Sequence, residues 1–159
     1  MSGGTHTIDV NPRTTNASGT RYYDGSLVAG SSTFNTFSNT VGGDTITLSG
    51  SGTIASAGVG SKGVTIGSLQ SAHPNYILGN ATLTITQRPV SLSGSRILGG
   101  TTDVLASELS FENLANSETL LLSGLGTIPT LGIGSFPLSL FTLSTVSYTH
   151  LTLPTICSV

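Results

Sequence analysis

The chain repeats itself, and this repeat constrains its fold more than any other feature. Residues 37–61, "FSNTVGGDTITLSGSGTIASAGVGS", align without a gap over residues 111–135, "FENLANSETLLLSGLGTIPTLGIGS". Residues 5–25 align over residues 80–100, with one residue of slip between the two blocks. A repeat of this length predicts small folded units in tandem, whereas a β-solenoid would need repeats of roughly 20 residues.

Within each copy, apolar residues alternate with polar ones. Ile8 and Val10 in one copy correspond to Leu83 and Ile85 in the other, and one polar residue separates each pair. Such alternation, bounded by Gly, Asn, Ser or Pro, predicts half-buried strands. The expected strands are 5–11, 44–49, 62–68, 81–87, 89–94, 118–123 and 136–143.

Composition favours the same fold class. Charged residues make up only 8% of the chain, which is rich in Ser, Thr, Gly and Val. Thr and Val suit a pleated, half-buried surface, and Gly and Asn suit turns. We therefore expect an all-β protein of tandem small β-sandwich-like or β-grasp-like units. A unit of this size has a small core and gains stability from its neighbours.

The register of the repeat assigns a place to each part of the chain. Residues 1–13 match the end of the first full unit, so we expect them to be the end of a preceding repeat. Residues 14–88 are expected to form a complete repeat and 89–145 a truncated second one. Residues 146–155, "VSYTHLTLPT", resemble a translated sequencing adapter, and we expect 146–159 to be an artefactual tail.

Charge and motif content exclude several classes of function. Five Lys and Arg with a net charge of -2 make no basic stripe, so we expect no nucleic-acid partner. No run of about 18 apolar residues predicts a membrane span. His6, His73 and Asp9 lack the nucleophile elbow of a hydrolase triad, and the acidic residues lack the spacing of a calcium loop. We expect no enzyme activity, no cofactor and no metal site.

Four spaced motifs point to a family. They are "YYDG" at 22–25, "GDTITLSGSGTI" at 43–54, "NYIL" at 75–78 and "LTITQRPV" at 83–90. This set resembles the YDG-type repeats of filamentous-haemagglutinin-like exoproteins. The resemblance implies a structural repeat fragment, from the stalk or passenger region of a large secreted bacterial surface adhesin. It also implies an extracellular or outer-membrane surface location, an export signal outside this segment, and neighbouring repeats of the same chain as partners.

Tyr23, Asp24 and Gly25 form the family motif, and Asp-Gly predicts a tight turn of the type I′ hairpin class. Tyr22 and Tyr23 are expected on opposite faces of an extended segment. The second copy reads "ILGG" at 97–100, so the Tyr-Asp pair is dispensable to the turn. This weakens any chemical role for the motif.

A binding module is the alternative function. In that case a loop region at 22–43 would contact a host surface glycan or protein through Tyr22, Phe34 and Phe37. The chain contains no Trp, and so sparse an aromatic patch favours the stalk.

Four arginines recur with the repeat. Arg13 corresponds to Arg88, and Arg21 to Arg96. We expect their guanidinium groups to cap loop carbonyls between stacked units.

Overall fold

The protein is almost entirely β-strand in its described parts. The structure is a computed structural model that describes residues 5–140, 144–145 and 151–152. These contain strands and two short 3-10 helices, η1 (Ser31–Thr33) and η2 (Ala106–Glu108), and no α-helix. The all-β prediction is confirmed, and the β-grasp alternative, which needs an α-helix, is not what forms. None of the described segments is a helix with the length and apolar character needed to cross a membrane.

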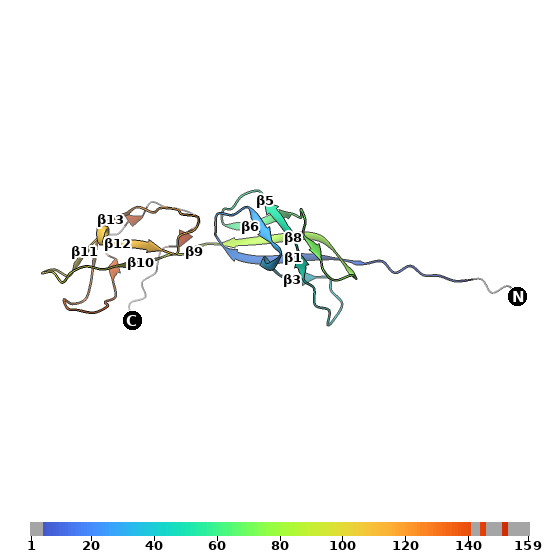
Figure 1. Ribbon diagram of the computed structural model, residues 1–159, viewed down its shortest axis with the longest axis horizontal. Coiled ribbons are helices and arrows are strands. Elements are labelled where there is room, and N and C mark those ends of the chain that lie inside the picture. The colour runs from blue at the N-terminus through green and yellow to red at the C-terminus, as the bar shows by residue number, and fades with distance from the viewer. Residues whose placement is uncertain (1–4, 141–143, 146–150, 153–159) are drawn as a thin grey trace. The chain divides into compact units, whose positions relative to one another are not determined.

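The chain divides into two compact units (Figure 1). Unit 1 comprises residues 1–21 and 26–85, and unit 2 comprises 22–25 and 86–159. The short segment 22–25 therefore groups with unit 2, although the repeat boundary predicted from sequence lies at residue 88.

Unit 1 is built around a six-stranded sheet. The strands of unit 1 are β1 (Arg13–Tyr22), β2 (Val28–Gly30), β3 (Phe34–Ser38), β4 (Leu48–Ser49), β5 (Ser51–Ile54), β6 (Gly60–Thr65), β7 (Gln70–Ser71) and β8 (Tyr76–Thr86). The last residue of β1 and the last residue of β8 are grouped with unit 2. The sheet order is β2-β5-β6-β8-β1-β3, and β4 pairs with β7 alone. The central strand β8 runs antiparallel to β6, and its arrow points the same way as that of β1 in Figure 1.

β8 supplies the centre of the core. Leu83 and Ile85 are only 0% and 1% exposed, and Ala81 beside them is also buried. Thr15 of β1 is fully buried as well, and its hydroxyl donates to the Ser38 carbonyl at 2.6 Å. Burying one large aliphatic side chain contributes about 1.5–3 kcal/mol. The stability of unit 1 therefore depends on β8 occupying the middle of the sheet.

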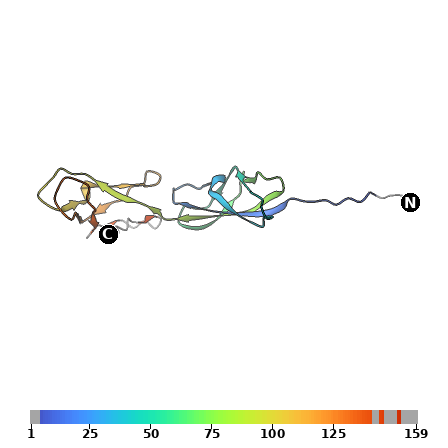
Figure 2. The same ribbon diagram turned by 90° about the horizontal axis from the view of Figure 1, so that it is seen from below.

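Unit 2 has shorter strands in smaller sheets (Figure 2). They are β9 (Arg88–Pro89), β10 (Ser91–Gly94), β11 (Asp103–Leu105), β12 (Leu109–Glu112), β13 (Leu122–Ser123), β14 (Leu125–Thr127), β15 (Ser139–Leu140), β16 (Ser144–Thr145) and β17 (Leu151–Thr152). β10 pairs with β12, β13 with β16 and β17 with β9, while β11, β14 and β15 form a three-stranded sheet.

The strand pairing repeats together with the sequence. Asn16 pairs with Ser38 in unit 1, and their repeat counterparts in unit 2, Ser91 and Glu112, pair with each other in the same way. The pairs β2–β5 and β11–β14 share one register in the same way, as do β4–β7 and β13–β16. The two copies of the sequence thus form the same pairs of strands.

A β-bulge accounts for the one-residue slip in the alignment. Ser18 pairs with Thr36, whereas the next residue, Gly19, pairs with Phe34, which leaves Asn35 as the extra residue of β3. The β10–β12 pair of unit 2 runs without interruption. An extra residue on one strand is what defines a bulge. The second copy of the repeat therefore lacks a counterpart of Asn35.

The strand expected at 5–11 is wrong. Residues 5–12 form no strand, and Ile8 and Val10 are each 88% exposed. Their alternation is that of β8, but no described strand pairs with them. A period-two pattern specifies which face is apolar, whereas a strand also needs a partner for its backbone groups.

The first strand of the structure, β1, is not among the expected strands. Its residues that face the core are small, so the sequence shows no alternation of large apolar and polar residues there. Thr15, Ala17 and Gly19 face the core. A Cβ added at Gly19 would lie 2.1 Å from the Thr33 carbonyl oxygen, so only glycine fits there. The strands expected at 44–49 and 118–123 shrink to two residues each, and residues 141–143 of the expected strand 136–143 lie outside the described residues.

Candidate functional site

The Tyr-Asp-Gly segment follows β1 and is not a hairpin turn. A type I′ turn needs positive φ at both central residues, but of Asp24 and Gly25 only Gly25 has it, at 72°. β1 and β2 are also not neighbours in the sheet. The predicted type I′ hairpin is therefore wrong, because the connection leads from β1 to the far edge of the sheet.

Tyr22 and Tyr23 lie on opposite faces, as predicted. Tyr22 is 59% exposed and Tyr23 is 8% exposed. Gly25 has a φ of 72°, a conformation that L side chains rarely adopt, and it lies beside Asn116, whose side-chain nitrogen would be 2.9 Å from a Cβ at this position. The segment is thus held against unit 2, to which it belongs.

Tyr23 is fastened through both its hydroxyl and its backbone. Its hydroxyl donates to Glu118 Oε1 at 2.6 Å, and its N–H donates to the Thr86 carbonyl at 2.8 Å. Arg88 Nη1 donates to the Tyr23 carbonyl at 3.3 Å. The hydrogen bond to Glu118, followed by burial and the nearby carboxylates, raises the pKa of Tyr23 from 10.0 to about 12. The phenol therefore stays protonated and serves as a hydrogen-bond donor.

Unit 1 has the same kind of contact at the equivalent carboxylate. The Tyr76 hydroxyl donates to Asp44 Oδ2 at 2.5 Å and accepts from Val41 N–H at 2.8 Å. Asp44 N–H donates to the Val41 carbonyl at 3.1 Å, just as Glu118 N–H donates to the Ala115 carbonyl at 2.9 Å. The bond to Asp44 raises the pKa of Tyr76. Each unit therefore fixes this turn by a buried tyrosine, although Tyr76 is the first residue of β8 and Tyr23 directly follows β1.

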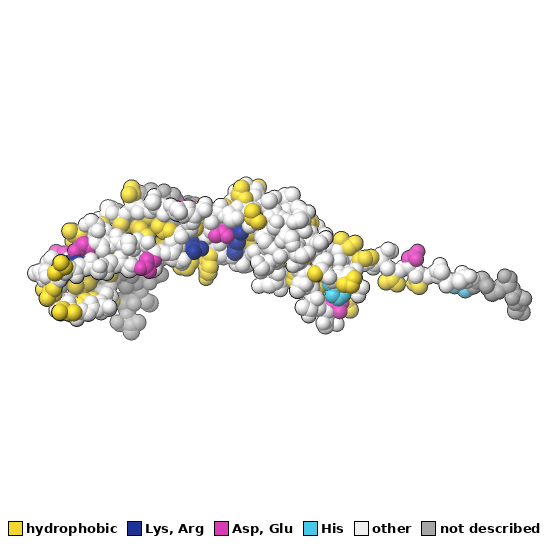
Figure 3. All heavy atoms as spheres, in the orientation of Figure 1, with side chains coloured by type: hydrophobic (Ala, Val, Ile, Leu, Met, Phe, Trp, Pro, Cys, Tyr) yellow, Lys and Arg dark blue, Asp and Glu magenta, His cyan; other side chains and the backbone are white. Residues whose placement is uncertain are grey.

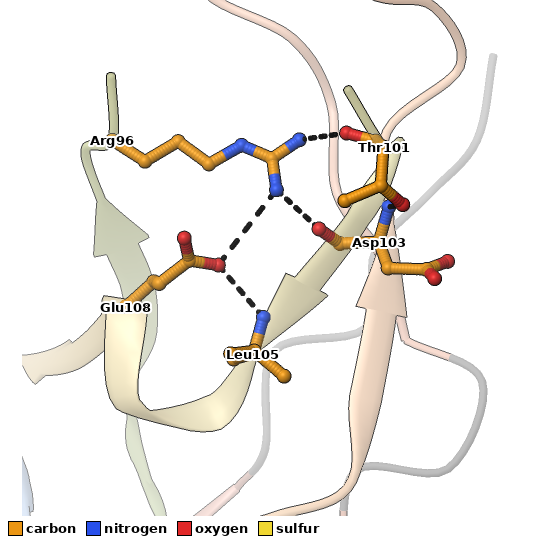
Figure 4. A network of polar contacts seen from close by, with 5 residues as sticks. All are labelled: Arg96, Thr101, Asp103, Leu105 and Glu108. Carbon is orange, nitrogen blue, oxygen red and sulfur yellow. Dashed lines mark hydrogen bonds and ion pairs between the residues drawn. The ribbon is translucent and has the colours of Figure 1, made fainter. Parts of the chain in front are cut away.

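Arg96 closes a loop in unit 2 (Figure 4). Its Nη2 donates to the Thr101 carbonyl at 2.5 Å, and its Nη1 donates to the Asp103 carbonyl. Nη1 also lies 3.8 Å from Glu108 Oε2, which in turn accepts from Leu105 N–H at 2.8 Å. One guanidinium group thus ties the start of β11 to η2.

Arg21 makes the matching clamp in unit 1. Its Nη1 donates to the Val28 carbonyl at 2.6 Å and its Nη2 to the Ser26 carbonyl at 2.5 Å. These two acceptors are the repeat counterparts of the two carbonyls that Arg96 binds. The prediction that the recurring arginines cap loop carbonyls is confirmed. The prediction that they do so between units is wrong, because each clamp closes within one unit.

A second arginine clamp holds the end of β3 and of β12. In unit 1, Arg13 Nη2 donates to Asn39 Oδ1 at 2.8 Å, and Asn39 Nδ2 donates to the Thr14 carbonyl at 2.7 Å. In unit 2, Arg88 Nη2 donates to Asn113 Oδ1 at 2.8 Å, and Asn113 Nδ2 donates to the Pro89 carbonyl at 2.8 Å. Both asparagines have a positive φ, of 60° and 62°. This conformation suits asparagine better than most other residues.

Comparison with known proteins identifies a family for the first half of the chain. The family described as "YDG domain" matches residues 7–85. A YDG domain is present there. No curated protein and no solved structure matches significantly. The match includes Tyr23, Asp24 and Gly25 and ends one residue before the end of β8.

The YDG domain does not offer the aromatic loop expected at 22–43. Residues 28–38 of that range form β2, η1 and β3, so the central part of it is not a loop. Phe34 is 5% exposed and lies in the core, and Phe37 on β3 is half-buried. The placement of Phe34 in an exposed loop is therefore wrong, because its position beside the bulge turns the ring inward. Of the three rings expected to contact a ligand, only Tyr22 is exposed.

The polar groups of the YDG domain and of unit 2 hold loops in place. Over the described residues, no group of three or more His, Cys, Asp and Glu side chains gathers where it could hold a metal ion. The tyrosine–carboxylate contacts at Asp44 and Glu118 are not apparent from either copy alone. The signal that points to them is the acidic residue kept at the same place in both copies.

Proposed function

We propose that this protein is a non-catalytic structural repeat from the stalk or passenger region of a large secreted bacterial surface adhesin. Its work is extension and display outside the cell or on the outer-membrane surface. The observation that carries the proposal is the repetition of strand register and of both arginine clamps. A chain built from equal units held by equal contacts is what a tandem array requires.

The use of charge supports this proposal over nucleic-acid binding. All four arginines donate to carbonyl or asparagine oxygens of their own unit. The remaining basic residue is Lys62. Since affinity for phosphate backbones comes from clustered Lys and Arg, we do not expect a nucleic-acid partner. Figure 3 shows few charged side chains on the face it presents.

Surface display can be tested with an epitope tag. Gly42 and Gly43 are suited to the insertion, because a Cβ at either position would meet no atom within 4 Å. In the bacterium that encodes the protein, an antibody to the tag should label intact cells as strongly as permeabilised ones. A tag at Gly19, which is packed against Thr33, serves as a control for a disrupted unit. Labelling that requires permeabilisation would overturn the proposal.

The exposed ring of Tyr22 supports a second candidate, a module that contacts a host glycan or protein. It predicts that the chain binds host cells and that Tyr22→Ala abolishes this binding. Leu27→Ala, which also removes a half-exposed side chain, should leave binding unchanged. The stalk proposal predicts no binding by any of the three proteins. Cell binding lost only in Tyr22→Ala would replace the stalk by the binding module.

A further inference from the structure

The Tyr-Asp-Gly segment belongs to one repeat by sequence and to the next by its contacts. In the sequence it lies within the copy at 14–88, yet in the structure residues 22–25 group with unit 2. Tyr23 is 8% exposed there, whereas its repeat counterpart Leu98 is 59% exposed. The second copy therefore does not bury the equivalent position within itself, and the burial of Tyr23 comes from unit 2.

Unit 2 holds the segment through its backbone as well as its ring. The Tyr23 hydroxyl donates to Glu118, and the Tyr23 N–H donates to the Thr86 carbonyl. Arg88 Nη1 donates to the Tyr23 carbonyl. Ala115, on the same turn as Glu118, is only 5% exposed. The docking surface of unit 2 therefore consists of Thr86, Arg88, Ala115 and Glu118.

Unit 1 carries the same docking surface in an open state. The repeat counterparts of those four residues are Asn11, Arg13, Val41 and Asp44, and all four are exposed. They line a hollow of about 660 Å³, to which Tyr76 also contributes. Val41 is 53% exposed, about tenfold more than its counterpart in unit 2. The hollow of unit 1 thus lies where unit 2 is covered by the Tyr-Asp-Gly segment.

The polar groups of this hollow are available for hydrogen bonds from outside the unit. Among the described residues, Arg13 Nη1 donates to no acceptor and the Asn11 carbonyl accepts from no donor. Asp44 accepts from the Tyr76 hydroxyl through Oδ2, and no described residue donates to its other oxygen. These are the counterparts of the three groups that bind Tyr23 in unit 2.

Tyr76 holds the turn of unit 1 from within and does not cover its outer side. The Tyr76 ring is 4% exposed, and its hydroxyl accepts from the Val41 N–H. The Val41 side chain nevertheless stays half-exposed. A second tyrosine can therefore approach Asp44 without displacing Tyr76.

We propose that the docking surface of unit 1 binds the Tyr-Asp-Gly segment of a YDG repeat placed ahead of it in the chain. The incoming tyrosine donates to Asp44 Oδ1 through its hydroxyl and to the Asn11 carbonyl through its N–H, and Arg13 Nη1 donates to its carbonyl. Each repeat is thus fastened to the next by one short segment, as a tandem array stabilised by nearest-neighbour contacts requires. The inference rests on the tandem arrangement in the proposed function and not on surface display, so the labelling of cells does not bear on it.

A duplication of residues 14–88 tests the inference within one chain. The variant consists of residues 1–88 followed by residues 14–159, which keeps the register of the repeat because Arg88 corresponds to Arg13. It contains a leading and a trailing duplicate of unit 1. Only the trailing duplicate has a Tyr-Asp-Gly segment ahead of it, so only its docking surface should be covered.

A single cysteine reports whether the surface is covered. All variants carry Cys157→Ser, and Val41→Cys is placed in either the leading or the trailing duplicate. Cysteine is closer in size than valine to Ala115, which occupies this position where the segment is docked. Because modification of a thiol requires access, iodoacetamide should react about fivefold or more slowly with the trailing cysteine than with the leading one.

Substitutions in the leading duplicate test whether the Tyr-Asp-Gly segment gives this protection. Tyr22→Ile/Tyr23→Leu/Asp24→Gly introduces the residues that the second copy carries at 97–99, so it leaves a native turn sequence. It should bring the rate of the trailing cysteine to within about twofold of the leading one. Tyr22→Ile alone is the matched control, because it removes a ring that is 59% exposed and should keep the protection.

Two further measurements make the result decisive. In the parent chain, Ala115→Cys with and without the same triple substitution calibrates the assay on the contact seen in unit 2. The leading cysteine should react at one rate in all variants, which shows that the fold is kept. Equal rates for the leading and trailing cysteines would overturn the proposal, since Tyr76 then replaces Tyr23 in a complete unit. Protection that persists in the triple variant would overturn it as well, because another part of the neighbouring repeat then covers the surface.

Discussion

The hydroxyl of Tyr23 should stabilise unit 2 by an amount that can be measured and that disappears at high pH. The ring is 8% exposed and the hydroxyl donates to Glu118 Oε1 at 2.6 Å. A hydrogen bond to a charged group contributes about 1.5–3 kcal/mol. Tyr23→Phe keeps the ring and removes only this bond, so it should increase local opening of unit 2 by about 10- to 150-fold at pH 7.

The pH dependence follows from the pKa of Tyr23. Its value of about 12 in the folded protein lies above the ordinary 10.0, so the folded state favours the protonated phenol. The stabilisation is therefore complete below pH 10 and is lost as the pH rises through about 12. Tyr23→Phe has no hydroxyl at this position, so this contribution to the pH dependence of unit 2 opening should be absent in the variant.

Amide hydrogen exchange measured by NMR is the assay, because it reports opening of unit 2 separately from unit 1. The amides of Tyr23 and Glu118, which donate to the Thr86 and Ala115 carbonyls, are the reporters. Tyr22→Phe is the control, since it removes the same atom from a ring that is 59% exposed. If the two variants exchange at the same rate, or if Tyr23 titrates near its ordinary pKa, the buried bond to Glu118 does not stabilise the turn.

Three further substitutions, two of them with a matched control variant, test the packing and the clamps. Leu83→Ala should lower the free energy of unfolding of unit 1 by about 2–5 kcal/mol in urea titrations followed by circular dichroism. Truncation to alanine at its repeat counterpart, Ile8→Ala, should cost less than about 0.5 kcal/mol, because that side chain is exposed. Arg21→Lys replaces a planar fork that binds two carbonyls by a single ammonium group, and should cost about 0.5–1.5 kcal/mol in the same assay; an unchanged midpoint would mean that the clamp is not stabilising. Gly19→Ala would place a Cβ 2.1 Å from a backbone oxygen and should cost more than about 2 kcal/mol, whereas Gly63→Ala, which meets no atom within 4 Å, should stay within about 1 kcal/mol. Equal thermal midpoints for the two glycine variants would contradict the close approach of β1 to Thr33.

The sequence predicts the candidate site only in part. The opposite faces of Tyr22 and Tyr23 follow from strand geometry, and the recurrence of Arg21 and Arg96 is visible in the alignment. The acceptors of these arginines are backbone carbonyls, which every residue carries, so the alignment does not distinguish a clamp within a unit from one between units. The partner of Tyr23 lies 95 residues away at Glu118, and only folding brings the two together.

The sequence by itself determined that the chain is all-β and that it repeats, because alternation and period are properties of residue order. It also set which side chains share a face in β8. Tertiary structure alone decided where strands form. Ile8 and Leu83 lie at the same repeat position, yet only Leu83 lies in a strand, because β6 and β1 offer it hydrogen-bond partners on both sides. β1 shows the converse: its inward residues are small, since a neighbouring backbone leaves room for nothing larger than glycine at position 19.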